Sequence, residues 1–287
     1  MVADQMTAAE YHATRALSSS LINTLLKKNA AAARRQQVAP DGEPTAQQEQ
    51  GTILHALVLE NRDLIAPIDA LDFRTKAAQD ARDQARQAGR IPIIAHKAGK
   101  LYDIAKTAKA AIQAALNIDF ESDGSAEYSI FWEYDGVKIK SRLDWLIHDR
   151  NLIVDLKFTE LSSIAAFERS IPASGYDVQG TLYPMAVSAA YGIPEPRFIF
   201  AVVDISDPDN PQTYFRDLSA AYRAIARVKI DRAAQIWKAC TESNIYPGYP
   251  QAVVTLDPPA WELATAEELD AQTHGFNVEN FLFGRVK

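Results

Sequence analysis

The chain has 287 residues, of which 47% are hydrophobic and 23% charged, an ordinary composition for a globular protein. No apolar run approaches the ~20 residues of a membrane span, and the N-terminus lacks the pattern of a secretory signal, so we expect a cytoplasmic protein without membrane contact. The lone cysteine, Cys240, excludes an intramolecular disulfide and a four-cysteine iron–sulfur cluster. A net charge of −7 argues against a protein that coats DNA, although a local basic groove would still bind it.

Hydrophobic periodicity predicts mainly helices before the middle of the chain. One of Ser18 to Ser20 would cap the first helix, whose basic C-terminal end is more often a solvated face than a DNA contact. In the second helix His55 has apolar neighbours, and such a histidine, taken alone, is usually a hydrogen-bonded core residue. The stretch between these two helices is polar and predicts a mobile loop. The expected helices cover residues 18–35, 51–60, 75–89 and 95–116.

Residues 127–158 have the clearest strand pattern, EYSIFWEYDGVKIKSRLDWLIHDRNLIVDLKF. Turn signals at Asp135-Gly136 and Asp149-Arg150 predict a three-strand antiparallel meander. Side chains alternate between the two faces of a strand, so one face of the meander is expected to be apolar. That face would hold Tyr128, Ile130, Trp132, Leu143, Trp145, Ile147, Val154, Leu156 and Phe158.

The opposite face of the meander is predicted to carry charged residues. If both loops are two-residue hairpins, Asp144 faces Glu127 on one side and Asp155 on the other. Directly opposed carboxylates repel, and such a cluster persists if its members are protonated or if a cation lies among them. One register further along, the same face would hold Ser129, Arg142 and Lys157.

Two interpretations of this charged face remain open from spacing alone. Carboxylate oxygens suit a hard divalent ion such as Mg²⁺, and a lysine nearby would orient or deprotonate a water. The alternative is an exposed face with interspersed salt bridges that also involve Lys138 and Lys140. A bulge in either strand would break the alignment on which the metal site depends.

The rest of the chain predicts alternating helices and strands. Gln179 and Tyr183 are four residues apart and share one face of a helix. Beyond residue 247, prolines predict an irregular tail. We expect a single domain over residues 1–287, with a mainly helical part (1–120), a core (121–245) and the tail (246–287). After the meander, the expected helices cover residues 163–169, 176–191 and 219–239, and the expected strands cover 197–204 and 212–217.

Five motifs in order resemble a known superfamily. Asp144 and the later Asp155-Leu156-Lys157 are similar to the split Asp…(Asp/Glu)-x-Lys core of PD-(D/E)xK nucleases. Residues 51–60 resemble the histidine motif of RecB-type members, and residues 179–183 resemble their Gln-x-x-x-Tyr helix. More narrowly, exonuclease VIII (RecE-like) proteins of prophages have similar sequences. The matching stretches are Glu10-Tyr11-His12 with Leu17-Ser18-Ser19-Ser20, residues 127–132 and residues 141–146.

This resemblance implies an α/β (α+β) fold with a restriction-endonuclease-like core, in which helices flank a central mixed sheet containing the meander. It implies a Mg²⁺-dependent deoxyribonuclease, with Mn²⁺ able to substitute. The activity expected is processive 5′→3′ digestion of linear double-stranded DNA from its ends, leaving 3′ single-stranded tails for recombination. It also implies a homo-oligomer, a tetrameric ring around DNA, and a single-strand annealing protein as partner.

The resemblance further implies roles for individual residues. His55 would be a metal ligand together with Asp144 and Asp155, and Lys157 would position or activate a water. Phe158 departs from the family, which often has threonine there, so no polar contact is expected from it. The remaining implied site residues are the Leu156 carbonyl as a ligand, Glu127 for a second ion or an outer-shell role, and Arg142, Tyr176, Gln179 and Tyr183 for substrate.

Two other functions remain open at this point. One is an end- or flap-processing endonuclease of the same superfamily, which would also cut circular DNA or internal sites. The other is a catalytically silent DNA-binding or assembly module, against which the intact set of Asp144, Asp155 and Lys157 argues.

Overall fold

The structure is a computed structural model that describes residues 2–3, 6–39, 42–161 and 163–274. By its internal contacts the chain divides into a large unit, Met1–Gly248, and a second unit, Tyr249–Lys287. The described helices of the large unit are α1 (Ala8–Ala13), α2 (Ser19–Lys27), α3 (Ala30–Val38), α4 (Ala46–Leu59), α5 (Lys76–Gln87), α6 (Ala95–Leu116), α7 (Ile164–Ser174), α8 (Tyr176–Tyr191) and α9 (Ala220–Ser243). Its strands are β1 (Val2–Ala3), β2 (Ile65–Ile68), β3 (Ile91–Ile94), β4 (Ser125–Tyr134), β5 (Val137–Ile147), β6 (Leu152–Thr159), β7 (Arg197–Asp204) and β8 (Gln212–Arg216).

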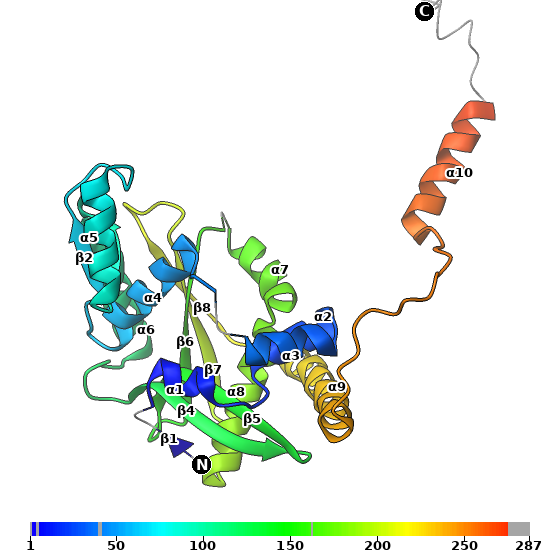
Figure 1. The fold of residues 1–287 in the computed structure, drawn as a ribbon. Coiled ribbons are helices and arrows are strands. Elements are labelled where there is room, and N and C mark those ends of the chain that lie inside the picture. The colour runs from blue at the N-terminus through cyan, green and yellow to red at the C-terminus, as the bar shows by residue number, and fades with distance from the viewer. Residues whose placement is uncertain (1, 4–5, 40–41, 162, 275–287) are drawn as a thin grey trace, which may run out of the picture. The chain divides into compact units, whose positions relative to one another are not determined.

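A six-stranded sheet in the order β1-β4-β5-β6-β7-β8 lies at the centre of the large unit. Strands β4, β5 and β6 form the expected antiparallel meander, and β7 joins β6 in parallel, so the sheet is mixed. Helices α4 and α6 pack on one side of it and α2, α3, α7, α8 and α9 on the other, while α5 packs against the small parallel sheet of β2 and β3 (Figure 1). The predicted α/β fold with a central mixed sheet is therefore confirmed.

Both hairpin registers agree with the prediction. Ser129 pairs with Arg142 in the first hairpin, and Trp145 pairs with Val154 in the second. The first turn has positive φ at both Asp135 and Gly136, the backbone that a tight two-residue turn requires. The second loop is longer than expected, because the last strand pair is Ile147 with Leu152, which leaves residues 148–151 as the loop.

The ladder is distorted at the position where the charged face was expected. Glu127 has φ +52, a left-handed backbone within β4, and such a residue bends a strand. Between β5 and β6, the described backbone pairs end at Trp145 with Val154, so the direct Asp144–Asp155 pair is not formed. Instead, the Leu156 N–H donates to Asp144 Oδ2 at 2.8 Å. Strands β5 and β6 separate at this point, because the Leu156 N–H donates to the Asp144 side chain instead of to a backbone oxygen of β5.

The same distortion divides the apolar face between two hydrophobic cores. Tyr128, Ile130 and Leu143 are buried in the first core, with residues of α2, α8 and α9. Trp145 and Leu156 are buried in the second core, with residues of α4 and α6. The prediction that these apolar residues share one face of the meander is therefore wrong. They are nevertheless buried or partly buried, as predicted.

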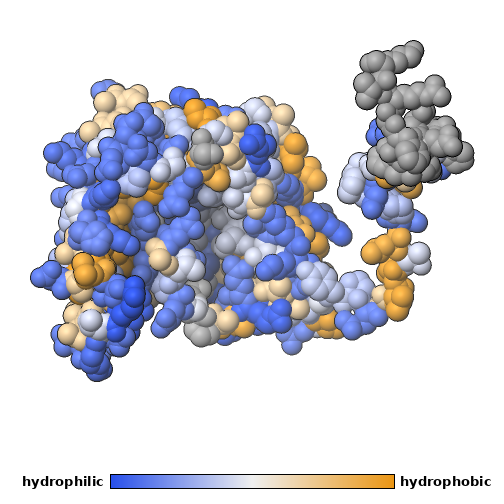
Figure 2. Space-filling view, turned by 90° about the horizontal axis from the view of Figure 1, so that it is seen from above, coloured by the Kyte–Doolittle hydropathy of each residue, from blue (hydrophilic) through white to orange (hydrophobic). Residues whose placement is uncertain are grey.

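Helix α8 is buried along most of its length between the sheet and α9, which explains its lack of a polar face. Its Gly180 permits close packing, since a Cβ there would lie 2.8 Å from Leu218 Cδ1 and 3.2 Å from the Phe198 ring. The surface of the large unit is mostly hydrophilic in the view of Figure 2, with apolar side chains scattered singly.

Local signals explain most helix boundaries. Asn29 accepts a hydrogen bond from Ala32 N, so it starts a new helix and divides the expected 18–35 helix into α2 and α3. Thr45 and Gln48 form a capping box at the start of α4, so the loop over residues 36–50 is shorter than predicted. None of the helices over the described residues is both long and apolar enough to cross a bilayer.

The second unit contains a helix, α10 (Ala260–His274), over its described residues. The prediction of an irregular tail over residues 246–287 is wrong for this stretch. That prediction depended on the prolines, but Pro258 and Pro259 precede the helix, a position where proline is tolerated. The residues that follow are rich in alanine, glutamate and leucine, which favour helices.

Candidate active site and metal centre

Three sequence-distant residues converge on one end of the distorted ladder. His55 on α4 places its Nδ1 3.6 Å from Oδ2 of Asp144 on β5. Glu127 on β4 joins them, and one ligand atom from each of the three lies within 4.8 Å of the others. Two carboxylates and an imidazole make a donor set that suits a divalent cation such as Mg²⁺ or Mn²⁺. These residues therefore fit the metal that the resemblance implies.

A second, fully buried group lies beside them on β6. Asp155 is 0% exposed, and its Oδ1 forms an ion pair with Lys157 Nζ. Its other oxygen accepts a hydrogen bond from Gln179 Nε2 on α8 at 2.8 Å. The Lys157 ammonium also lies 5.0 Å from the centre of the Tyr176 ring. The structure thus brings together Asp155, Lys157, Gln179 and Tyr176, whose proximity sequence periodicity could not establish.

Burial dominates the electrostatics of the carboxylates. It raises the pKa of Asp144 to about 6, against the opposing effect of the Lys157 charge. Burial, followed by the nearby Asp144 charge, raises the pKa of Asp155 to about 7. Negative charge is therefore poorly solvated here, and a cation among these oxygens would stabilise it.

The pKa values of the two basic side chains, Lys157 and His55, shift in opposite directions. Burial alone lowers the pKa of Lys157, but the charges of Asp155 and Asp144 outweigh it, so the pKa is raised. Burial and the Lys157 charge both lower the pKa of His55. At neutral pH the lysine therefore carries its proton, and the imidazole is neutral with a lone pair available to a metal.

Other predicted residues form the rim of this centre. Arg142 pairs with Glu127 through its Nε. Tyr183 is 6% exposed, and burial raises its pKa well above the ordinary value, so it remains a neutral hydroxyl. Leu156 lines a small cavity together with His55, Lys157 and Tyr176. The Phe158 ring packs edge-on against His55, with 5.9 Å between the ring centres, so this position makes an apolar contact.

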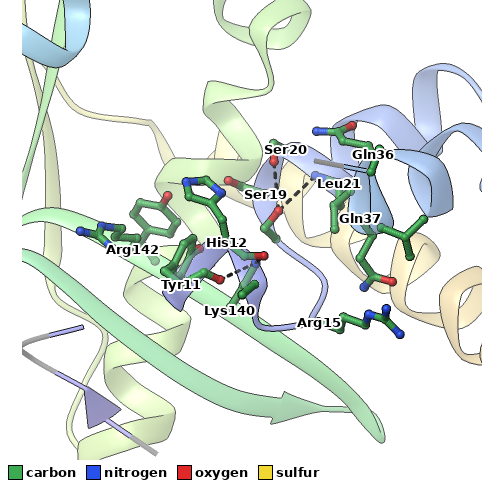
Figure 3. A pocket seen from close by; sticks show the side chains of 15 residues that line it. Tyr11, His12, Arg15, Ser19, Ser20, Leu21, Gln36, Gln37, Lys140 and Arg142 are labelled. Carbon is green, nitrogen blue, oxygen red and sulfur yellow. Dashed lines mark hydrogen bonds between the residues drawn. The ribbon is translucent and has the colours of Figure 1, made fainter. Parts of the chain in front are cut away.

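Two residues near the rim were not predicted as part of the site. Tyr11 on α1 lies against Arg142, whose guanidinium is 5.5 Å from the centre of its ring. Lys140 is buried, and its Nζ donates to the backbone oxygens of Tyr11 and Thr14 at 2.8 Å each. The alternative interpretation of the charged face, an exposed surface with salt bridges, is therefore wrong for Lys140, because α1 covers it (Figure 3). The motif Glu10-Tyr11-His12 lies on this helix, which the sequence pattern did not predict.

We expect the contribution of Asp155 to the stability of the metal-free protein to fall as pH rises from about 4 to about 7. Over this range folded Asp155 retains a proton that the unfolded chain has lost, so folding is favoured at the acidic end. Asp155→Asn imitates the protonated form, so its stability advantage over the wild type should be about 4 kcal/mol at pH 8, roughly 1 to 2 kcal/mol at pH 5 and close to zero at pH 3. Urea unfolding in EDTA measures this difference, and a difference that is independent of pH would contradict the assignment.

Comparison with known proteins gives a family. The model of a PDDEXK-like domain of unknown function, DUF3799, matches residues 18–251. The chain belongs to this PDDEXK-like family. The predicted membership of the PD-(D/E)xK superfamily is thereby confirmed, and the motif residues Asp144, Asp155 and Lys157 lie within the matched region. No curated protein matches the sequence.

A solved structure shares the fold of this PDDEXK-like chain. It is a protein from Eubacterium rectale, provisionally named an exonuclease, with 15% identity and a TM-score of 0.58 over 91% of this chain and 98% of its own. A phage-related exonuclease from Haemophilus somnus 129PT has 10% identity and a TM-score of 0.33, over 67% and 95% of the two chains. An alkaline exonuclease, LHK-Exo, from Laribacter hongkongensis has 13% identity and a TM-score of 0.29, over 69% and 98%. The last two scores lie below the level that indicates a shared fold.

Proposed function

We propose that this chain is a Mg²⁺-dependent deoxyribonuclease, a processive 5′→3′ exonuclease that degrades linear double-stranded DNA and leaves 3′ single-stranded tails. The observation that carries the proposal is the convergence of His55, Glu127 and Asp144 beside the buried Asp155–Lys157 pair. Membership of the PDDEXK-like family and the provisional name of the Eubacterium rectale protein agree with it.

Asp144, Asp155 and His55 would hold Mg²⁺, or Mn²⁺ in its place, with the Leu156 carbonyl and Glu127 as further oxygen donors. The bound ion would supply Lewis-acid stabilisation of the charge that develops on the scissile phosphate. The chain prepares this site before any ion binds. The Leu156 N–H fixes the orientation of the Asp144 carboxylate, and the neutral His55 presents a nitrogen lone pair to the same place.

Lys157 acts as a charged donor in this mechanism. Its raised pKa keeps it protonated, so it orients the attacking water and stabilises the phosphate charge rather than removing a proton. Gln179 holds one oxygen of Asp155 and leaves the other to Lys157. Tyr176 lies under the Lys157 ammonium and limits its movement.

The substrate strand would lie along the rim. Arg142 offers a cation to a phosphate, although its pairing with Glu127 means that it also neutralises the centre. The neutral Tyr183 hydroxyl can donate to a phosphate oxygen at the same edge. A tetrameric ring and a single-strand annealing partner complete the proposal. Their support is the resemblance of residues 10–20 and 127–146 to the exonuclease VIII proteins.

The test is digestion of linear and closed-circular duplex DNA, each with Mg²⁺ and with EDTA, by the wild type and by Asp155→Ala. We expect Mg²⁺-dependent loss of the linear form only, loss of a 5′ label first, and no digestion by the variant. Degradation of both DNA forms would favour an endonuclease of the same superfamily. If neither form is cut while DNA still binds, the chain is a silent binding module and the proposal is wrong.

A further inference from the structure

A cavity lined by several basic residues lies away from the proposed catalytic carboxylates. It has a volume of about 320 Å³ and is enclosed by the β4–β5 turn, by α3 and α9, and by the segment between α1 and α2. Four cationic side chains contribute to its lining, together with two aromatic rings, those of Trp237 and Tyr246. The cationic residues are Arg15, Arg34, Lys138 and Lys238.

The positive charge of this cavity is only partly neutralised by the protein. Lys238 Nζ lies 3.7 Å from Asp135, and Glu242 is the one carboxylate that lines the described cavity. Over the described residues, Arg15 and Arg34 have no carboxylate within ion-pair distance. Arg34 instead donates to Gln37 and lies 5.0 Å from the centre of the Tyr246 ring. In a chain with net charge −7, such a cluster favours an anionic ligand.

The cavity continues toward the catalytic site. Arg15 and Gln37 line it and also line a larger cavity of about 680 Å³. That larger cavity is also lined by Arg142 and Tyr183, on the rim of the metal centre. Figure 3 shows Arg142 at one end of it and Arg15 with Gln37 at the other. The two cavities adjoin at Arg15 and Gln37, and we treat them together as one groove, whose length suits a linear polymer better than a single small anion.

We propose that this groove binds one strand of DNA, and that the cavity of Arg15, Arg34, Lys138 and Lys238 holds its phosphates several nucleotides away from the catalytic site. The proposal rests on the proposed function, since it extends the same substrate beyond the metal centre. Guanidinium and ammonium groups beside aromatic rings are the usual lining of a single-strand groove. A cavity of about 320 Å³ is small beside the width of a duplex, so it suits the nucleotides of a single strand better.

The test uses the full chain with Arg34, Lys138 and Lys238 all changed to glutamine, three residues outside the catalytic centre. A control changes three lysines of α6, Lys97→Gln, Lys100→Gln and Lys106→Gln, and so removes the same charge. Fluorescence anisotropy in EDTA measures binding of oligothymidylates of about four and about twenty nucleotides over a range of salt. The rate of linear duplex digestion with Mg²⁺ gives kcat and KM for the same proteins.

We expect the wild type to bind the longer oligonucleotide more tightly, and the groove variant to lose about tenfold in that affinity with a salt slope smaller by about two. Its affinity for the short oligonucleotide and its kcat at saturating DNA should stay within about twofold of the wild type. The α6 control should change little. Equal losses in both variants, an unchanged groove variant, or equally strong binding of polyglutamate would each overturn the assignment of this groove to a DNA strand. A wild type that binds the strand and fails to cut DNA would instead overturn the proposed function.

Discussion

Replacing Lys157 with methionine is expected to lower the rate of DNA cleavage about a thousandfold, with DNA affinity nearly unchanged. The substitution removes the ammonium group that pairs with Asp155 and keeps a side chain of similar length. In the proposed mechanism the protonated lysine stabilises charge that appears only in the transition state, so its loss should lower kcat rather than raise KM. Single-turnover digestion of a 5′-labelled linear duplex with saturating Mg²⁺ measures the effect.

A matched control separates chemistry from stability. Lys229 also pairs with a buried carboxylate, Asp177, at 2.5 Å, but lies outside the proposed centre. Lys229→Met should lower stability and leave the rate per folded molecule within about twofold of the wild type. Asp144→Asn should resemble Lys157→Met in rate but also weaken Mg²⁺ binding, which isothermal titration measures. A Lys157→Met protein that cleaves DNA at near the wild-type rate would remove this residue from the mechanism.

Replacing Phe200 with alanine is expected to destabilise the large unit by about 4 kcal/mol. Phe200 is fully buried on β7, where it pairs in register with Asp155. Its ring contacts those of Phe198 at 4.8 Å, Tyr176 at 5.8 Å and Phe167 at 6.4 Å between centres. Removal of the ring leaves a cavity between β6, α7 and α8, and the neighbouring rings cannot close it without moving.

Thermal and urea unfolding measure this effect. A loss of this size in a unit of about 250 residues corresponds to a fall in Tm of roughly 10 °C. Phe200→Leu should cost less than half as much, since most of the volume is kept. Trp261→Ala, at a position 70% exposed, controls for the loss of a large aromatic residue and should change stability by less than about 0.5 kcal/mol. Equal effects of Phe200→Ala and Phe200→Leu would show that the ring does not fill the core as described.

The sequence by itself determined the meander and its register. Asp135 and Gly136 adopt the positive φ that a tight turn needs, and a tight turn fixes which residues pair across the hairpin. The register of the second hairpin was predicted from a two-residue loop at residues 149–150, and it holds because the longer loop of residues 148–151 has the same centre. The residues of the PD-(D/E)xK motif could likewise be identified from the sequence, since they lie in a contiguous, strongly patterned stretch.

Tertiary structure alone decided how the site is assembled. His55 and Asp144 are far apart in the sequence, and only the packing of α4 against the second core brings them to 3.6 Å. The left-handed Glu127 and the bond from Leu156 N–H to Asp144 replace the regular pairing that alternation predicts. From its strand alone, Lys140 would be expected on the surface. It is buried because α1, which contacts it from 129 residues earlier in the chain, lies across it. Local patterns specify turns and faces, whereas contacts between distant segments depend on how whole elements pack.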